Sequence, residues 1–146
     1  MRKTKLGGRF GAAALACAVA LGLFSAGRAA SVTTSYTSSQ ATSGGKYFAA
    51  TCAQCHGEHL EGGVGPALTG PNFVTLSKTT HLTVSDLFQF MALQMPLNEP
   101  ASLPKDHYAA IMAYILKVNG YASGSKALTY DEAMNSKMPI TDKKGK

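Results

Sequence analysis

The chain has 146 residues, which is long enough for one domain with its own hydrophobic core. Its formal net charge is +6, but five of its 14 basic residues lie among the first 28 positions, where no acidic residue occurs. Beyond that segment nine lysines face eight acidic residues, so the basic excess belongs to the N-terminus and nucleic acid is set aside as a partner class.

The N-terminal segment has the three-part layout of a secretory signal peptide. Met1–Arg9 is positively charged, Phe10–Phe24 is uncharged and apolar, and small residues precede a cleavage point after Ala29. The apolar run is shorter than the roughly 20 residues that span a bilayer, which argues against an uncleaved anchor. A lipoprotein signal at Cys17 fits poorly because too little apolar sequence precedes it. We therefore predict that residues 1–29 are removed, and that the mature protein is periplasmic and has no membrane span.

The first half of the mature chain alternates between loops and short helices. Residues 30–42 are rich in Ser and Thr without periodicity, which predicts a flexible N-terminal arm. A short helix is expected from about Ser43 to Ala53, with Ser43 as its cap. Glycines and prolines dominate Gly57–Asn72, which indicates a loop that fits closely around another group. Apolar residues at helical spacing predict the next helix over Thr83–Leu93.

The second half contains the clearest helix. Three prolines make Met95–Pro104 an extended loop, and the apolar face that follows predicts a helix with Ser102 as its cap and Gly120 at its end. Residues 125–146 are weakly patterned and form a C-terminal tail, whose last six residues are expected to be disordered. The only strand-like run, Phe73–Leu76, is short.

These elements predict an all-α fold, with three to four short helices and long loops forming one domain over residues 43–124. Short helices and glycine-rich loops cannot bury much apolar surface by themselves. A large, flat, apolar cofactor at the centre would supply the missing core.

One motif specifies such a cofactor, the Cys-x-x-Cys-His sequence Cys52-Ala53-Gln54-Cys55-His56. The two thiols lie three residues apart on one side of a helical turn, where they can bond to the two vinyl groups of a haem. His56 can then reach the iron. A zinc site would need about four ligands, and a thioredoxin site would need a βαβ surrounding. The motif therefore predicts one covalently bound haem c, attached through Cys52 and Cys55.

From about Gln40 to Gly124 the chain resembles the class I (mitochondrial-type) c-type cytochromes. Besides the haem motif, the matching features occur in the family's order: Gly44, Phe48, Gly65-Pro66-Ala67-Leu68, Met95-Pro96, Tyr108 and Ala113-Tyr114-Ile115-Leu116. The stretch from Met95 to Tyr121 is also similar to the small cytochromes that accept electrons from periplasmic quinoprotein alcohol dehydrogenases. The resemblance implies the small cytochrome c fold, wrapped around one haem.

The axial iron ligands are His56 and, by elimination, a methionine. Met95 follows His56 by 39 residues and lies in a proline-stiffened loop before the last predicted helix, where the family has its ligand. Met91 is more simply a core residue, and Met138 forms a second Met-Pro pair further on; both remain as alternatives.

The resemblance also implies residues that shape the site. The Pro66 carbonyl is the implied acceptor for the Nδ1–H of His56, and Leu68 is implied to pack on the porphyrin. Phe48 and Tyr114 are implied to pack where the first and last helices cross, near Gly44.

A thioether opposite an imidazole raises the reduction potential and fills the position where a substrate would bind. The chain is therefore predicted to have no catalytic residues and to carry single electrons in the periplasm. Its donor would be a dehydrogenase, such as a quinoprotein alcohol dehydrogenase, and its acceptor an oxidase or another cytochrome of the respiratory chain. The alternative is a peroxidase-type haem enzyme with a displaceable sixth ligand.

Overall fold

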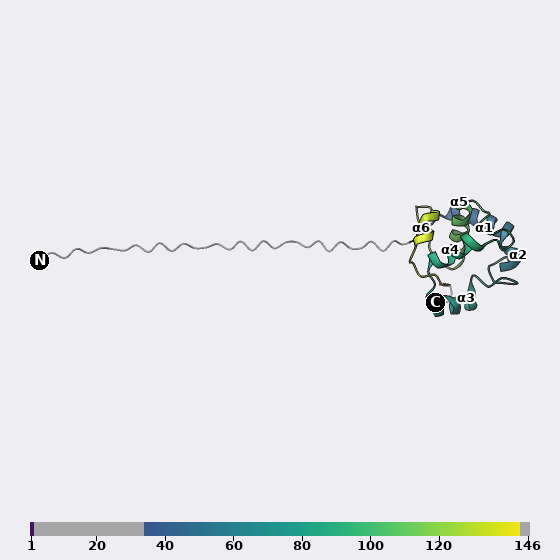
Figure 1. The fold of residues 1–146 in the computed structure, drawn as a ribbon, viewed down its shortest axis with the longest axis horizontal. Helices are drawn as coiled ribbons and strands as arrows, with labels where there is room; N and C mark the ends of the chain where they lie inside the picture. Colours follow the sequence, from purple (N-terminus) through teal and green to yellow (C-terminus); the bar gives the residue numbers. More distant parts are fainter. Residues whose placement is uncertain (2–33, 144–146) are drawn as a thin grey trace. The chain divides into compact units, whose positions relative to one another are not determined.

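The structure, a computed structural model, describes Met1 and residues 34–143 (Figure 1). The predicted signal peptide lies outside the described residues apart from Met1. The chain divides into two units, Met1–Ala30 and Ser31–Lys146, and the second contains every described helix. The helices are α1 (Ser38–Thr51), α2 (Ala53–His56), α3 (Gly70–Thr80), α4 (Val84–Gln94), α5 (Lys105–Val118) and α6 (Tyr130–Asn135). Residues 34–143 contain no strand, only an isolated bridge between Thr83 and Pro139, so the predicted all-α class is confirmed.

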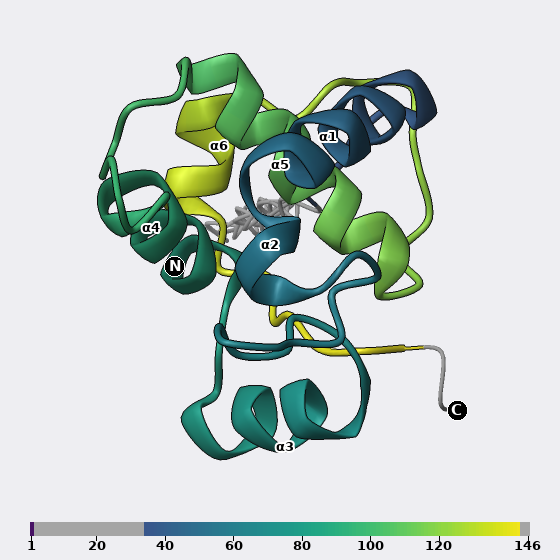
Figure 2. The ribbon, with the colours of Figure 1, turned by 90° about the vertical axis from the view of Figure 1, so that its right-hand side faces the viewer.

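The helices α1 and α5 cross and form the most extensive helix–helix packing of the domain (Figure 2). Gly44 permits this crossing, because a Cβ atom there would lie 1.8 Å from the carbonyl oxygen of Ala110. The rings of Phe48 and Tyr114 meet at the same crossing, with their centroids 5.5 Å apart. Any side chain larger than hydrogen at position 44 would force the two helices apart.

The start of α1 corrects the expected helix over Ser43–Ala53. The helix begins at Ser38, inside the segment predicted to be a flexible arm, and Thr37 caps it by accepting a hydrogen bond from the Gln40 amide at 3.1 Å. Tyr36, just before the cap, is fully buried. Residues 34–42 are therefore ordered, because one cap and one aromatic anchor outweigh the polar composition of the segment.

The C-terminal segment also differs from the tail expected over 125–146. The short helix α6 packs against α4 and α5, and the Phe88 and Tyr130 rings meet edge to face at 5.1 Å. The chain then pairs with the start of α4, where the Val84 amide donates to the Met138 carbonyl at 2.8 Å. Ile140 is buried, so this segment is part of the core. Of the six residues expected to be disordered, 141–143 are described and 144–146 are not.

Three local features can be compared with the sequence analysis. The strand-like run Phe73–Leu76 lies within α3, which takes up the end of the expected loop; a proline sits in its first turn and Phe73 is buried. No side chain caps α5, so Ser102 does not have the expected role. The helix predicted over Thr83–Leu93 is α4, capped by reciprocal hydrogen bonds between Thr83 and Asp86. Among the described residues, no helix has the length and apolarity needed to cross a membrane.

Candidate haem site

The Cys-x-x-Cys-His motif forms a tight turn at the junction of α1 and α2. The Cys52 amide closes α1 by donating to Phe48, and the Cys52 carbonyl accepts from the Cys55 and His56 amides at 3.1 and 3.0 Å. Both thiols are free; Cys52 is half-buried and Cys55 is exposed. Burial raises the pKa of the Cys52 thiol, so this side chain is neutral at physiological pH. The turn thus presents two thiols and an imidazole from five consecutive residues.

The loop after the motif folds back over His56. The Gly62 amide donates to the His56 carbonyl and the Gly65 amide to the Cys55 carbonyl, both at 2.8 Å. The ring atom His56 Nδ1 lies 2.8 Å from the Pro66 carbonyl oxygen. A carbonyl can only accept, so Nδ1 is the donor, and in the neutral ring Nε2 then has the lone pair. This is the tautomer that a metal-binding histidine needs.

Gly65 leaves room for the imidazole. A Cβ atom at this position would lie 2.9 Å from His56 Cε1, closer than side-chain carbons approach, and a tight 3.0 Å from Nδ1. The glycine and the Pro66 carbonyl together fix the plane of the ring. The donor set of one free imidazole nitrogen beside two thiols fits a c-type haem.

Met95 lies directly after α4. Its amide closes the helix by donating to Met91, and its carbonyl accepts from the Ala101 amide at 3.2 Å and from the Tyr108 hydroxyl at 2.5 Å. Its side chain is partly buried against the core. Met138 is held at the other end of the same helix, beside Val84. The backbones of these two methionines are therefore roughly 15 Å apart along α4, and the side chains of both pack against the core.

The structure adds one residue that the sequence reasoning missed. Asn119 is fully buried after α5, and its side-chain amide donates to the Leu68 and Ile115 carbonyls, both at 2.9 Å. Leu68 is also held through its own amide, which donates to Leu60 at 2.8 Å. Asn119 thus ties the loop beyond the haem motif to the end of α5. The sequence signal that could have pointed to Asn119 is its position directly before Gly120, the glycine that ends the helix.

His81 and His107 are placed by contacts outside the motif. His81 ends α3 in the left-handed conformation, and His107 stacks on Tyr47 with ring centroids 3.7 Å apart. Within residues 34–143, no three His, Cys, Asp or Glu side chains are grouped as a metal site would require.

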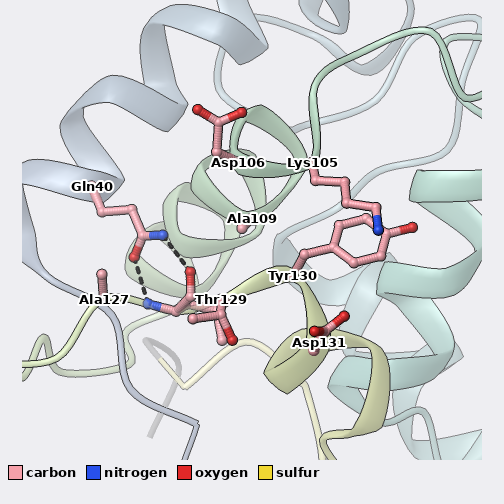
Figure 3. A pocket seen from close by; sticks show the side chains of 9 residues that line it. Gln40, Lys105, Asp106, Ala109, Ala127, Thr129, Tyr130 and Asp131 are labelled. Atoms are coloured by element: carbon pink, nitrogen blue, oxygen red, sulfur yellow. Dashed lines mark hydrogen bonds between the residues drawn. The ribbon is translucent and has the colours of Figure 1, made fainter.

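A pocket of about 460 Å³ lies on another part of the domain (Figure 3). Residues of α1, α5 and α6 and the segment before α6 line it, and none belongs to the haem motif. Its main polar groups are already engaged: the Gln40 amide makes two hydrogen bonds to the Leu128 backbone, and the Lys105 ammonium lies 5.0 Å from the Tyr130 ring centroid. This pocket is not part of the candidate site.

A helical domain of this size with a Cys-x-x-Cys-His turn, a proline carbonyl on the histidine and a later methionine loop defines a class I c-type cytochrome. The chain belongs to the family described as cytochrome c oxidase, cbb3-type, subunit III, whose model matches residues 39–115. The family carries haem c and serves electron transfer.

One solved structure has a similar fold, a chain in the crystal structure of the sulfane dehydrogenase SoxCD from Paracoccus pantotrophus. The two chains are 22% identical, with a TM-score of 0.54, and the match covers 74% of this chain and 62% of that one. At this identity the likeness shows the fold alone. No curated protein matches the chain.

Proposed function

We propose that this protein is a periplasmic monohaem cytochrome c that carries single electrons from a dehydrogenase toward the respiratory chain. The observation that carries the proposal is the geometry of His56, whose Nδ1–H is bound by the Pro66 carbonyl, leaving Nε2 free for iron. The Pro66 acceptor and the fit of Gly65 against the ring support this use of His56.

In this proposal Cys52 and Cys55 hold a single haem covalently, and His56 and Met95 are its axial ligands. The bound haem supplies a reversible one-electron change between Fe(II) and Fe(III). The Pro66 carbonyl increases the basicity of His56 and keeps its ring oriented. A Met95 thioether held by the haem would leave no iron position for water or peroxide, which supports electron transfer over peroxidase chemistry. Leu68, whose carbonyl is anchored by Asn119, would pack beside the porphyrin.

The proposed donor is a periplasmic dehydrogenase. The predicted signal peptide supports an exported protein, and the stretch from Met95 to Tyr121 resembles cytochromes that serve quinoprotein alcohol dehydrogenases. The solved structure with a similar fold is itself a chain of a dehydrogenase. The proposed acceptor is an oxidase or another cytochrome.

Covalent attachment is the direct test. The protein is expressed in a host with a haem-ligation system, and its mass and acid–acetone extract are measured. We expect one haem that resists extraction, a mass increased by one haem, and a chain that starts after Ala29. Replacing both Cys52 and Cys55 by Ala is the control and should make the haem extractable. An extractable haem in the parent protein would falsify the proposal.

A further inference from the structure

Tyr108 connects α5 to the loop that carries Met95. The residue lies in the first turn of α5 and is only 2% exposed. Its hydroxyl donates to the Met95 carbonyl at 2.5 Å and accepts from the Leu103 amide at 3.4 Å. One side-chain oxygen thus bonds to both ends of the loop between α4 and α5.

The same carbonyl has a second donor. The Ala101 amide lies 3.2 Å from the Met95 oxygen, so the loop closes on itself as well as on Tyr108. Other hydrogen bonds within the loop are local, from Glu99 to Pro96 and from Ser102 to Glu99. The Tyr108 hydroxyl is therefore the side-chain group that anchors the Met95 backbone to α5.

Burial alone does not require a hydroxyl at this position. A phenylalanine ring would fill the same space, but it would leave the Met95 carbonyl with one donor fewer in a partly buried place. A methionine side chain is unbranched and flexible, so it reaches a fixed point reliably only if its backbone is fixed. The restraint on the carbonyl is thus a restraint on the thioether.

We propose that Tyr108 is a positioning residue, whose hydroxyl holds Met95 so that the thioether stays on the haem iron. The inference rests on the proposed function, in which Met95 is an axial ligand. The hydroxyl bonds to the Met95 carbonyl, so it would act on the thioether through the backbone of the ligand residue.

The test replaces Tyr108 by Phe in the haem-loaded protein. We expect the helical content and haem attachment to be retained. Cyanide should replace the thioether faster, by about three- to tenfold, the range expected from one lost hydrogen bond. Hydrogen exchange of the Ala101 amide, which shares the Met95 carbonyl, should speed up as well. Tyr108 replaced by p-aminophenylalanine keeps a donor at the same place and should restore the parent cyanide rate.

Tyr114→Phe is the matched control. It lies on the same helix, about 9 Å further along the axis than Tyr108, and its ring packs on Phe48 at the α1 crossing. This variant should bind cyanide at the parent rate. If Tyr108→Phe also binds cyanide at the parent rate, or if the p-amino variant is as fast as Phe, the positioning role is wrong.

The variant Met95→Ala distinguishes a failure of the Tyr108 positioning role from a failure of Met95 as the iron ligand. If Met95→Ala opens the sixth position while Tyr108→Phe changes nothing, the ligand is right and the positioning role is wrong. If Met95→Ala keeps the parent spectrum, the ligand assignment fails and the positioning role fails with it.

Discussion

Met95 has the backbone restraints expected of a residue whose side chain must stay in one place. Replacing it by Ala should leave the haem attached, abolish the absorption band that a thioether gives with Fe(III), and lower the reduction potential, because a weaker electron acceptor than sulfur then faces the iron. Optical spectroscopy and potentiometry measure both effects.

Two other methionines provide controls for this prediction. Met91→Leu and Met138→Leu preserve apolar volume and should leave the band and the potential in place. Met91 is buried in the core and Met138 lies at the opposite end of α4. Loss of the band in either control, with Met95→Ala unchanged, would reassign the ligand.

Gly65 has little tolerance for a side chain. In Gly65→Ala the new methyl group would lie 2.9 Å from His56 Cε1, so either the loop or the ring must move. We expect a loss of about 1–3 kcal/mol in the free energy of unfolding, the usual cost of overpacking, and a lower yield of haem-loaded protein. Denaturant unfolding and the ratio of haem to protein provide the measurements.

Gly45→Ala is the corresponding control within α1. Its methyl group would lie 3.2 Å from the side chain of Tyr114, which can shift, and alanine favours a helix over glycine by about 1 kcal/mol. Its haem yield should equal that of the parent. Equal haem yields for Gly65→Ala and the parent would mean that the loop is not fitted to the His56 ring.

Single residues differ in how far the sequence can predict them. Cys52, Cys55 and His56 are adjacent, so their spacing alone indicates the chemistry, and the Pro66 acceptor follows from the resemblance to a family. Asn119 bonds to Leu68, 51 residues away in the chain, and no local pattern encodes such a pairing. Residues that join distant loops need the fold before their role can be seen.

Prediction of whole helices from the sequence is limited in a similar way, because a short helix offers too little periodicity. The helix α4 was predictable because its apolar residues recur over three turns, whereas α6 has only six residues and too little periodicity. The missed signal was the pair Thr129 and Glu132, a capping box three residues apart. A similar pair, Thr37 and Gln40, stands at the start of α1. Its Gln40 side chain does not bond back to the cap; it bonds to the Leu128 backbone and joins α1 to the C-terminal segment.

The capping box of α6 makes the stability of this helix depend on pH. The Lys126 ammonium and the Thr129 amide and hydroxyl lower the pKa of Glu132 from 4.5 to about 2. A carboxyl group with a depressed folded-state pKa stabilises the fold above its unfolded pKa and loses that contribution as the pH falls. The contribution should therefore be complete above pH 4.5 and vanish progressively between about pH 4.5 and 2.

Glu132→Gln tests this dependence. The variant should unfold at a lower temperature than the parent at pH 7, with the difference shrinking as the pH falls toward 2. Asp131→Asn, on the same turn but outside the capping box, is the control and should show a smaller difference. A pH-independent gap between Glu132→Gln and the parent would assign the effect to lost packing instead of charge.

Residues 30–146 carry almost balanced charge, and several large apolar side chains are exposed on α4 and in the loop after it. Phe90 and Leu93 are 58% and 50% exposed on α4, and Leu97 is 79% exposed in the loop after Met95. Phe90 lies about 200° around the helix from the buried Phe88, so it faces away from the core. The nearest charges in the sequence are Asp86 and Glu99, and no lysine or arginine occurs between residues 79 and 104.

This distribution predicts how electron transfer to a partner depends on salt. Exposed charges are screened over about 8 Å at physiological ionic strength, and near-zero net charge gives little long-range steering. We expect only a modest fall in the rate of reduction by candidate dehydrogenases as salt rises, measured by stopped flow. Leu97→Asp should slow the reaction about tenfold by placing a charge in an apolar contact, whereas Glu99→Lys should change it little.

Leu97 is a better position for this test than the neighbouring Ala101. The backbone of Ala101 has φ of +58°, a left-handed conformation in which a larger side chain is strained, so a substitution there would disturb the Met95 loop itself. Leu97→Asn, which is polar but uncharged, separates lost apolar contact from added charge and should slow the reaction less than Leu97→Asp. A steep fall in rate between low and physiological salt, with Leu97→Asp unaffected, would instead place docking on a charged ring elsewhere on the domain.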